Sequence, residues 1–206
     1  MEDLVELVNV LKSTLDFLGD ELDLELPTIV VIGEASVGKS SVIDSLIGID
    51  LLPKGPNITT KCPTVIELVQ EDGPALTFRI VEIPGLIGAE NSENLPRHLM
   101  IEELIKEHIS QDNIIIFAVV DAKTDVKSSE IFKIIDKMGK MPDTVGIVSK
   151  IDLSESDDVK RIVENRLVVP GKGWILVKNR GDNEREVKSL ETAQNDEMEY
   201  IKQYFQ

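Results

Sequence analysis

A glycine-bounded loop followed by a lysine and two serines is the stretch whose residue types and spacing could do chemistry. Gly33 and Gly38 bracket four residues and are followed at once by Lys39, which is the G-x-x-x-x-G-K-[ST] spacing of a phosphate-binding loop. In such a loop backbone N–H groups surround the phosphates, Lys39 bridges the β- and γ-phosphates, and the Ser40 hydroxyl binds Mg²⁺. The alternative is an ordinary strand-to-helix turn. The predicted nucleotide-binding residues are Gly33, Glu34, Ala35, Ser36, Val37, Gly38, Lys39, Ser40 and Ser41.

A second polar motif follows a later apolar run and could select the base. Ser149, Lys150 and Asp152 match the guanine-reading pattern [NT]-K-x-D with serine in its first place. The Asp152 carboxylate can accept hydrogen bonds from the ring N1–H and the exocyclic amine of guanine, whereas adenine would present an acceptor to it. Lys150 would lay its stem on the ring, and Leu153 completes the predicted base site. The alternative is a solvated lysine and aspartate at a strand end. The motif predicts GTP and GDP as ligands.

A third motif would meet the γ-phosphate and the metal. Where GTPases carry Asp-x-x-Gly, the sequence has Glu82 and, three residues later, Gly85. The extra methylene keeps the charge, so we expect Mg²⁺ binding with an altered geometry. Thr60 is the candidate second Mg²⁺ ligand and γ-phosphate sensor, with Thr59 as its rival, unless both are plain loop residues. The predicted metal ligands are Ser40, Thr60 and Glu82.

The spacing of hydrophobic residues predicts the elements that position these motifs. Continuous apolar runs are typical of parallel strands buried on both faces, and spacing of three and four residues is typical of helices. Strands are predicted at residues 28–32, 64–70, 76–83, 113–120, 144–149 and 173–177, and helices at 40–47, 97–109, 128–138, 157–167 and 184–205. A turn signal between the second and third strands makes them an antiparallel hairpin. The alternation predicts an α/β fold with a mostly parallel sheet, one antiparallel edge hairpin and helices on both faces, with the ligand at the carboxyl ends of the strands.

Composition restricts the remaining classes. The chain has 206 residues, 42% of them hydrophobic, which suits one buried core. With 22 basic and 38 acidic residues its net charge is −16, which argues against nucleic acid and anionic membranes as partners of this segment. The single Cys62 excludes an internal disulfide, and the acidic start without a basic leader predicts a cytoplasmic location. His98 and His108 lack metal-ligating companions and are expected on a solvated helix face.

Together these motifs resemble the GTPase domain of the dynamin superfamily over nearly the whole chain. The family's patterns G-x-Q-S-[SA]-G-K-S-S, L-P-R-G with T-R-x-P, D-L-P-G, G-V-[IL]-T-K-x-D and V-x-N-R are mirrored at residues 33–41, 52–55 with 60–63, 82–85, 146–152 and 177–180. The resemblance implies a P-loop GTPase fold, GTP hydrolysis, and a role in membrane remodelling or fission. It also implies that Asn179 and Arg180 contact the base, that residues 121–125 meet a partner domain, and that two copies associate across the nucleotide face.

Apolar residues at spacings of three and four predict an amphipathic helix over residues 1–18, followed by an acidic linker. The resemblance makes this helix part of a bundle beside the GTPase domain. The expected division is residues 1–22 for the helix and linker and 23–206 for a GTPase domain truncated at its C-terminus. The resemblance also implies that membranes are reached only through stalk and lipid-binding regions that this sequence lacks, so the protein is expected to be cytoplasmic and at most peripheral to membranes. The implied catalytic residues are Ser36, Lys39, Thr60 and Gly85, with the attacking water held by the Thr60 carbonyl and the Ser36 region.

One departure concerns catalysis directly. Ala35 stands where the family has a water-orienting glutamine, and a methyl group cannot hold water by a hydrogen bond. An alternative function is therefore a GTP-loaded switch or scaffold with weak or no hydrolysis, because of Ala35 and Glu82. A P-loop ATPase or kinase is a further alternative, although the sequence has no convincing adenine-reading element.

Overall fold

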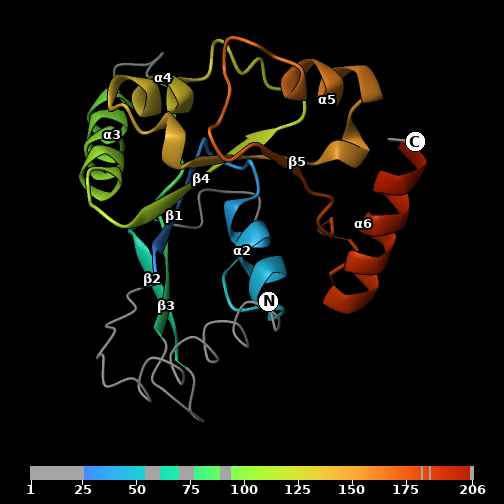
Figure 1. Cartoon of the computed structure of the whole chain (residues 1–206). Coiled ribbons are helices and arrows are strands. Elements are labelled where there is room, and N and C mark those ends of the chain that lie inside the picture. The colour runs from blue at the N-terminus through green and yellow to red at the C-terminus, as the bar shows by residue number, and fades with distance from the viewer. Residues whose placement is uncertain are drawn as a thin grey trace, which may run out of the picture.

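The computed structural model describes residues 26–53, 61–69, 77–88, 94–181, 183–185 and 187–204, and Figure 1 shows one six-stranded sheet at its centre. The strands are β1 (Thr28–Gly33), β2 (Thr64–Val69), β3 (Thr77–Glu82), β4 (Ile114–Asp121), β5 (Thr144–Ser149) and β6 (Trp174–Leu176), in the order β2-β3-β1-β4-β5-β6. Every neighbouring pair is parallel except the antiparallel pair β2 and β3. The predicted sheet and its edge hairpin are therefore confirmed.

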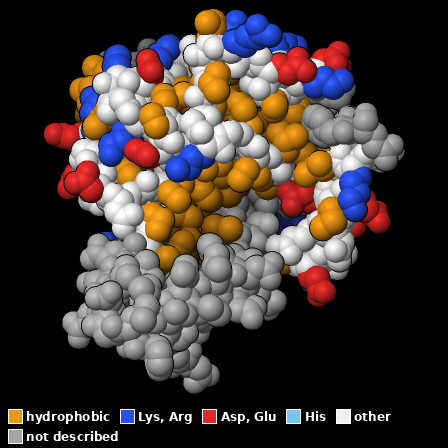
Figure 2. Space-filling view, viewed as in Figure 1, with side chains coloured by type: hydrophobic (Ala, Val, Ile, Leu, Met, Phe, Trp, Pro, Cys, Tyr) orange, Lys and Arg blue, Asp and Glu red, His pale blue; other side chains and the backbone are white. Residues whose placement is uncertain are grey.

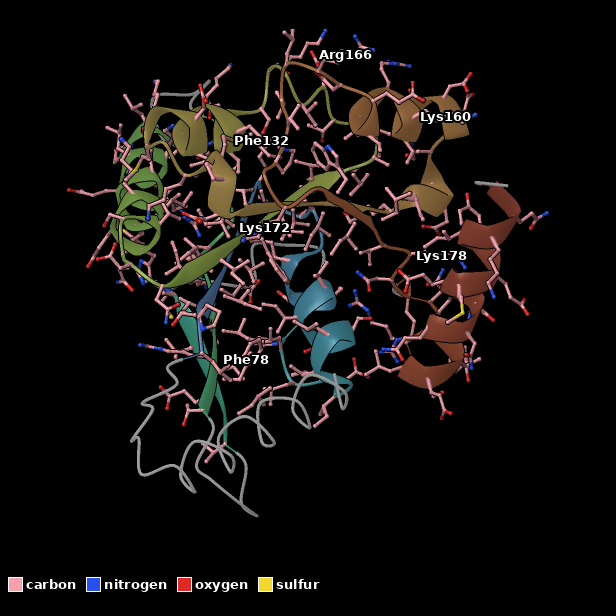
Figure 3. The ribbon with its side chains drawn as sticks, viewed as in Figure 1. Phe78, Phe132, Lys160, Arg166, Lys172 and Lys178 are labelled. Atoms are coloured by element: carbon pink, nitrogen blue, oxygen red, sulfur yellow. The ribbon has the colours of Figure 1, made fainter. Side chains whose placement is uncertain are left out.

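Helices cover both faces of this sheet, as predicted (Figure 1). They are α2 (Lys39–Ile47), α3 (Leu95–Ile109), α4 (Glu130–Lys137), α5 (Ser156–Val163) and α6 (Leu190–Tyr204), and single 3₁₀ turns occur at Met141–Asp143 and Ile151–Leu153. The larger core cluster joins α3, α4 and α5 to one face of the sheet. In it, Phe132 lies on α4 (Figure 3). Its ring contacts Trp174 of β6, with ring centroids 5.5 Å apart. The smaller cluster lies under α2.

The central strand β1 explains the position of the phosphate loop. Its side chains alternate between the two clusters, Val30 and Ile32 in the larger and Ile29 and Val31 in the smaller, and all four are buried. A strand that is buried on both faces needs such a continuous apolar run. Because β1 pairs in parallel with both β3 and β4, its carboxyl end lies between the carboxyl ends of these two strands. The loop after Gly33 therefore lies where three strands end together.

Some hydrophobic side chains near α2 are only partly buried by the described residues. Figure 2, viewed as Figure 1, shows hydrophobic side chains across the middle of the molecule. Phe78, Ile115 and Phe117 are only partly buried there, packed against the smaller cluster. Helix α6 lies beside α2, and the Gln194 side chain donates a hydrogen bond to the Ser45 carbonyl at 3.0 Å. Helix α6 therefore packs partly on α2 instead of covering this part of the sheet.

Two predicted helices are shorter than expected, for local reasons. The helix predicted at 157–167 ends at Val163, because the Asn165 side chain accepts hydrogen bonds from the N–H groups of Leu167 and Val168 and turns the chain. The helix predicted at 184–205 begins at Leu190. Ser189 precedes it, and its hydroxyl oxygen accepts the Thr192 N–H at 3.1 Å, which is an N-cap.

The expectation that His98 lies on a solvated face is wrong. Its exposure is 7%, because it continues the inward stripe of α3, which includes Ile101, Ile105 and Ile109 at spacings of three and four residues. His108 is half-buried and contacts the Leu104 carbonyl of its own helix. Residues 1–22, Thr59 and Thr60 lie outside the described residues. Within the described ranges the structure has no helix with the length and apolar character that crossing a bilayer requires.

Candidate functional site

The phosphate loop turns sharply between β1 and α2. Ser36 and Gly38 have positive φ angles of 63° and 95°, the left-handed region, and α2 begins directly after Gly38. Glycine adopts this conformation without the steric cost of a side chain. The first backbone N–H groups of α2 thus point back into the loop, and the positive end of the helix dipole adds to their attraction for an anion. The conformation of this loop therefore suits the phosphate binding that the sequence predicts.

Lys39 directs its ammonium group into this loop. The side chain is 6% exposed, and Nζ donates hydrogen bonds to the carbonyls of Glu34 at 2.8 Å and Gly33 at 3.3 Å. Burial lowers the pKa of Lys39 to about 8, and the nearby carboxylates of Glu82 and Glu34 oppose this shift. At neutral pH the amine is thus still mostly charged. The group lies where phosphate oxygens can replace the two carbonyls as acceptors.

Ser40 and Glu82 meet at the end of β3, where the metal is predicted. The Ser40 hydroxyl donates to Glu82 Oε1 at 2.6 Å, and Glu82 is 1% exposed. A hydroxyl and a carboxylate are hard oxygen donors, so this pair fits Mg²⁺. Among the described residues no three His, Cys, Asp or Glu side chains gather as a ready metal site. A metal here would therefore depend on Ser40 and Glu82 together with oxygens from the nucleotide.

The base motif is joined to the phosphate loop by Ser149. Its hydroxyl lies 2.5 Å from the Val37 carbonyl, to which it donates, and 3.1 Å from the Val120 carbonyl. Lys150 has a positive φ of 56°, and its Nζ forms an ion pair with Asp121 at 2.9 Å. Asp152 and Leu153 follow, exposed, in the 3₁₀ turn. The serine in the first place of the motif thus fixes the distance between the two halves of the predicted site.

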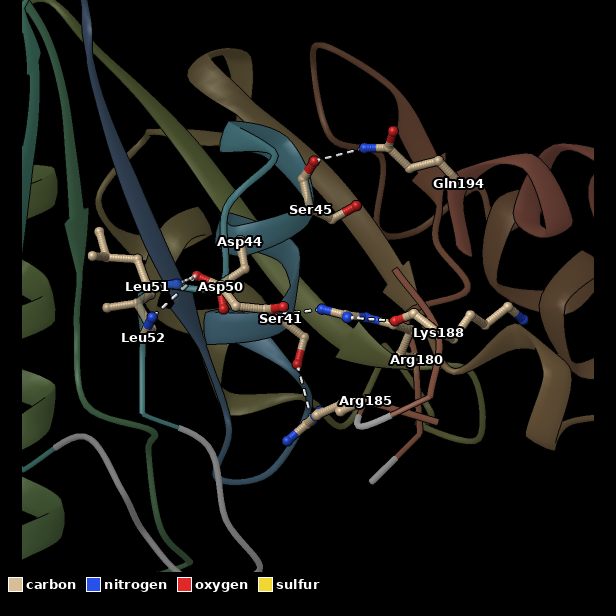
Figure 4. Close-up of polar contacts among 10 residues, drawn as sticks. All are labelled: Ser41, Asp44, Ser45, Asp50, Leu51, Leu52, Arg180, Arg185, Lys188 and Gln194. Atoms are coloured by element: carbon tan, nitrogen blue, oxygen red, sulfur yellow. Dashed lines mark hydrogen bonds and ion pairs between the residues drawn. The ribbon is translucent and has the colours of Figure 1, made fainter. Parts of the chain in front are cut away.

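The predicted pair Asn179 and Arg180 lies nearby, but the arginine head is directed elsewhere. Arg180 is 8% exposed, and its guanidinium binds Asp50 Oδ1 at 2.5 Å and the Lys188 carbonyl at 2.8 Å (Figure 4). These contacts fasten the segment after β6 to the chain beyond α2. The Asn179 amide nitrogen is buried and has no hydrogen-bond partner among the described residues, so it is a donor available to a ligand.

Arg185 was not predicted and belongs to the same region. Its guanidinium donates to the Ser41 hydroxyl at 3.4 Å, in the first turn of α2 (Figure 4). Both residues line a hollow between α2 and α6, together with Ser45, Lys178, Asn179 and Arg180. The sequence carries little signal for it, because residues 178–188 hold four basic and three acidic residues. A cation beside α2 is suited to a polyanionic ligand.

The Ala35 backbone is engaged by the third motif. Its N–H donates to the Leu86 carbonyl at 2.9 Å, and the Leu86 N–H donates to the Gly33 carbonyl at 3.1 Å. Glu34 lies beside Ser129 and Glu130, at the start of α4. Burial raises the pKa of its carboxyl, and Glu130 raises it further. The Glu34 carboxylate therefore interacts with the start of α4 as well as with Lys39.

Comparison with known proteins identifies relatives of this chain. The Dynamin family model matches residues 29–82. Dynamin-1 of Rattus norvegicus is 28% identical over 247 residues, which covers 94% of this chain and 28% of dynamin-1. Dynamin-3 of Homo sapiens is 27% identical over 252 residues, which covers 94% of this chain and 29% of dynamin-3. The chain therefore spans less than a third of the length of these curated relatives.

A solved structure supports the fold independently. The crystal structure of a dimerization-deficient mutant of Toc33 from Arabidopsis thaliana has a TM-score of 0.54 and 18% identity to this chain. The match covers 83% of this chain and 76% of the Toc33 chain. At this identity the likeness concerns the fold alone. It confirms the predicted fold, whereas the resemblance to the dynamin superfamily is supported by the family model and by the dynamin relatives.

Proposed function

We propose that this chain is a GTPase domain of the dynamin superfamily, which it resembles, and that it binds GTP with Mg²⁺ and hydrolyses it to GDP and phosphate. The observation that carries the proposal is the Ser149 hydrogen bond to the Val37 carbonyl, which joins the guanine motif to the phosphate loop. One nucleotide can then contact Asp152 with its base and Lys39 with its phosphates. The Asp152 carboxylate selects guanine, because it pairs two donors that adenine lacks.

The proposed reaction is attack of water on the γ-phosphorus, with cleavage of its bond to the β–γ bridging oxygen and release of GDP. Lys39 neutralises charge on the β- and γ-phosphates, and the Gly85 N–H donates to the γ-phosphate. Ser40, Thr60 and Glu82 would hold Mg²⁺, which supplies charge neutralisation to the phosphate oxygens when bound. The Thr60 carbonyl and the Ser36 region orient the water, in the absence of a side chain at Ala35 that could do so.

A switch with weak turnover is the second candidate, and Ala35 favours it. Its methyl cannot orient water, and its N–H is bonded to Leu86. In either case the names of the relatives suggest a role in membrane remodelling for a longer protein, cytoplasmic and reaching membranes through other regions. Self-association across the nucleotide face belongs to the same proposal. The division into residues 1–22 and 23–206 stays a prediction, because the first part lies outside the described residues.

Steady-state GTP turnover measured against protein concentration tests the proposal, with Lys39→Ala and EDTA as controls. A rate per molecule that rises with concentration and is lost in both controls supports a GTPase that acts between two copies. Tight GTP binding without turnover supports the switch. Equal competition by ATP, or full GTP affinity in Lys39→Ala, would show that the proposal is wrong.

A further inference from the structure

Residues 84–88, directly after β3, are bonded onto the phosphate loop. Beyond the strand ends, Glu34 and Leu86 form a parallel bridge through the two hydrogen bonds of Leu86 to Ala35 and Gly33. The Leu86 side chain is 2% exposed, so this contact also has an apolar anchor. The pairing of β1 with β3 thus continues past both strands and covers one side of the loop.

This arrangement leaves little space beside Lys39. A Cβ placed on Gly85 would lie 2.6 Å from Ala35 Cα and 2.9 Å from Lys39 Nζ. Gly85 therefore lies closely against Ala35 and the Lys39 ammonium group, beside the position proposed above for the γ-phosphate. We expect a diphosphate to bind the loop N–H groups and Lys39 without displacing Gly85. The γ-phosphate of GTP needs residues 84–88 to shift outward before the Gly85 N–H can donate to it.

A buried histidine opposes that movement. His98 Nδ1 donates to the Ile87 carbonyl at 2.6 Å, and because a carbonyl oxygen only accepts, this nitrogen carries the proton. The ring is 7% exposed and is flanked by Glu102 at 3.9 Å and Glu130 at 3.8 Å. Helix α3 is itself anchored in the larger core cluster. The hydrogen bond therefore ties Ile87 to a rigid part of the fold.

We propose that His98 is a positioning residue which, by holding Ile87, keeps residues 84–88 on the phosphate loop and so disfavours GTP relative to GDP. The inference rests on the proposed function, since it concerns the same nucleotide site. It gives α3, which carries none of the nucleotide-binding motifs, a role in nucleotide selection. Loss of the hydrogen bond to the Ile87 carbonyl lowers the free energy needed to move residues 84–88 away from the phosphate loop. GTP binding therefore becomes tighter, and GDP binding stays unchanged.

The test compares dissociation constants for GDP and a non-hydrolysable GTP analogue in His98→Ala and in the matched control His108→Ala. Both substitutions remove a histidine from α3, but the hydrogen bond of His108 is to the Leu104 carbonyl of its own helix and does not involve residues 84–88. We expect His98→Ala to bind the analogue about 3- to 10-fold more tightly relative to GDP, as for the loss of one net hydrogen bond. Hydrogen exchange of the Leu86 amide without nucleotide should become faster in the same variant. His108→Ala should match the parent in both measurements.

A second pair of variants addresses the hydrogen bond itself and serves if His98→Ala does not fold. Asparagine places its amide nitrogen near the position of Nδ1, whereas glutamine places it near Nε2. His98→Asn should therefore resemble the parent, and His98→Gln should favour the analogue. An unchanged ratio in His98→Ala or His98→Gln, an equal shift in His108→Ala, or a shift toward GDP would overturn the inference. A parent that binds no guanine nucleotide overturns the proposed function and the selection with it.

Discussion

The buried charge of Lys39 should make nucleotide affinity and stability respond to pH in opposite directions. Burial lowers the pKa of this amine from 10.5 to about 8 in the folded chain. The unfolded chain therefore binds more protons than the folded chain between these values, and this group adds stability as pH rises from about 8 to 10.5. A pKa shift of this size corresponds to about 3 kcal/mol of unfolding free energy. About 2 kcal/mol of it should appear as an increase in stability between pH 7 and 10.

Urea unfolding of the parent and Lys39→Met across this range isolates the effect, because other lysines and tyrosines titrate equally in both. The unfolding free energy of the parent minus that of Lys39→Met should rise by about 2 kcal/mol from pH 7 to 10. GDP affinity should do the reverse, since phosphates bind the charged amine. The GDP dissociation constant should change little near neutral pH and rise by up to about fivefold from pH 8 to 9.

Calorimetry at pH 8.5 in two buffers of different ionisation enthalpy provides an independent measurement, because binding should take up protons there. Measurements stop below the pH at which guanine itself ionises. A difference in unfolding free energy that falls or stays constant from pH 7 to 10 would refute the assigned environment of Lys39. GDP binding without proton uptake at pH 8.5 would place the amine away from the phosphates.

Three substitutions test the other parts of the site. Asp152→Asn should weaken GTP binding by about 2–4 kcal/mol in calorimetry, because guanine donors lose a charged acceptor, while the exposed control Asp157→Asn should not change it. Ser149→Ala should cost about 1–2 kcal/mol in urea unfolding by leaving the buried Val37 carbonyl without its donor. Ala35→Gln should leave GTP affinity within about 1 kcal/mol and raise kcat on the order of 10²-fold across a protein titration. An active parent with an unresponsive Ala35→Gln would show that another group already positions the water.

Much of the fold could be predicted because its strong signals are local. The strands β1, β4 and β5 are runs of β-branched residues, and burial on both faces requires such runs wherever the strands pair. The phosphate loop and the base motif could be predicted from spacing, because each is one short segment whose residue types and spacing are themselves the signal. The ends of α5 and α6 were missed, because single side chains, those of Asn165 and Ser189, decide them.

The parts of the site that sequence could not predict depend on contacts between distant segments. Arg180 pairs with Asp50 from 130 residues away, and no spacing rule connects them. The contact of Leu86 with the phosphate loop is made by backbone atoms, which carry no signal of residue type. His98 belongs to the apolar stripe of α3, but a histidine there cannot be distinguished from a solvated one until its partner, the Ile87 carbonyl, is placed.

The cations of the site are all held by acceptors from the protein, which determines how a nucleotide must bind. Lys39 donates to two loop carbonyls, Lys150 pairs with Asp121, and Arg180 pairs with Asp50. The charges of Lys150 and Arg180 are thus already paired with carboxylates, and Lys39, which is held by neutral carbonyls, is left to neutralise the phosphates. The overall charge of −16 opposes the ligand further. Affinity should then depend on the metal more strongly than in a neutral protein, because a divalent cation between Glu82 and the phosphates supplies positive charge that the chain has not already paired. EDTA should accordingly weaken binding of GTP more than that of GDP, whose phosphates carry less charge.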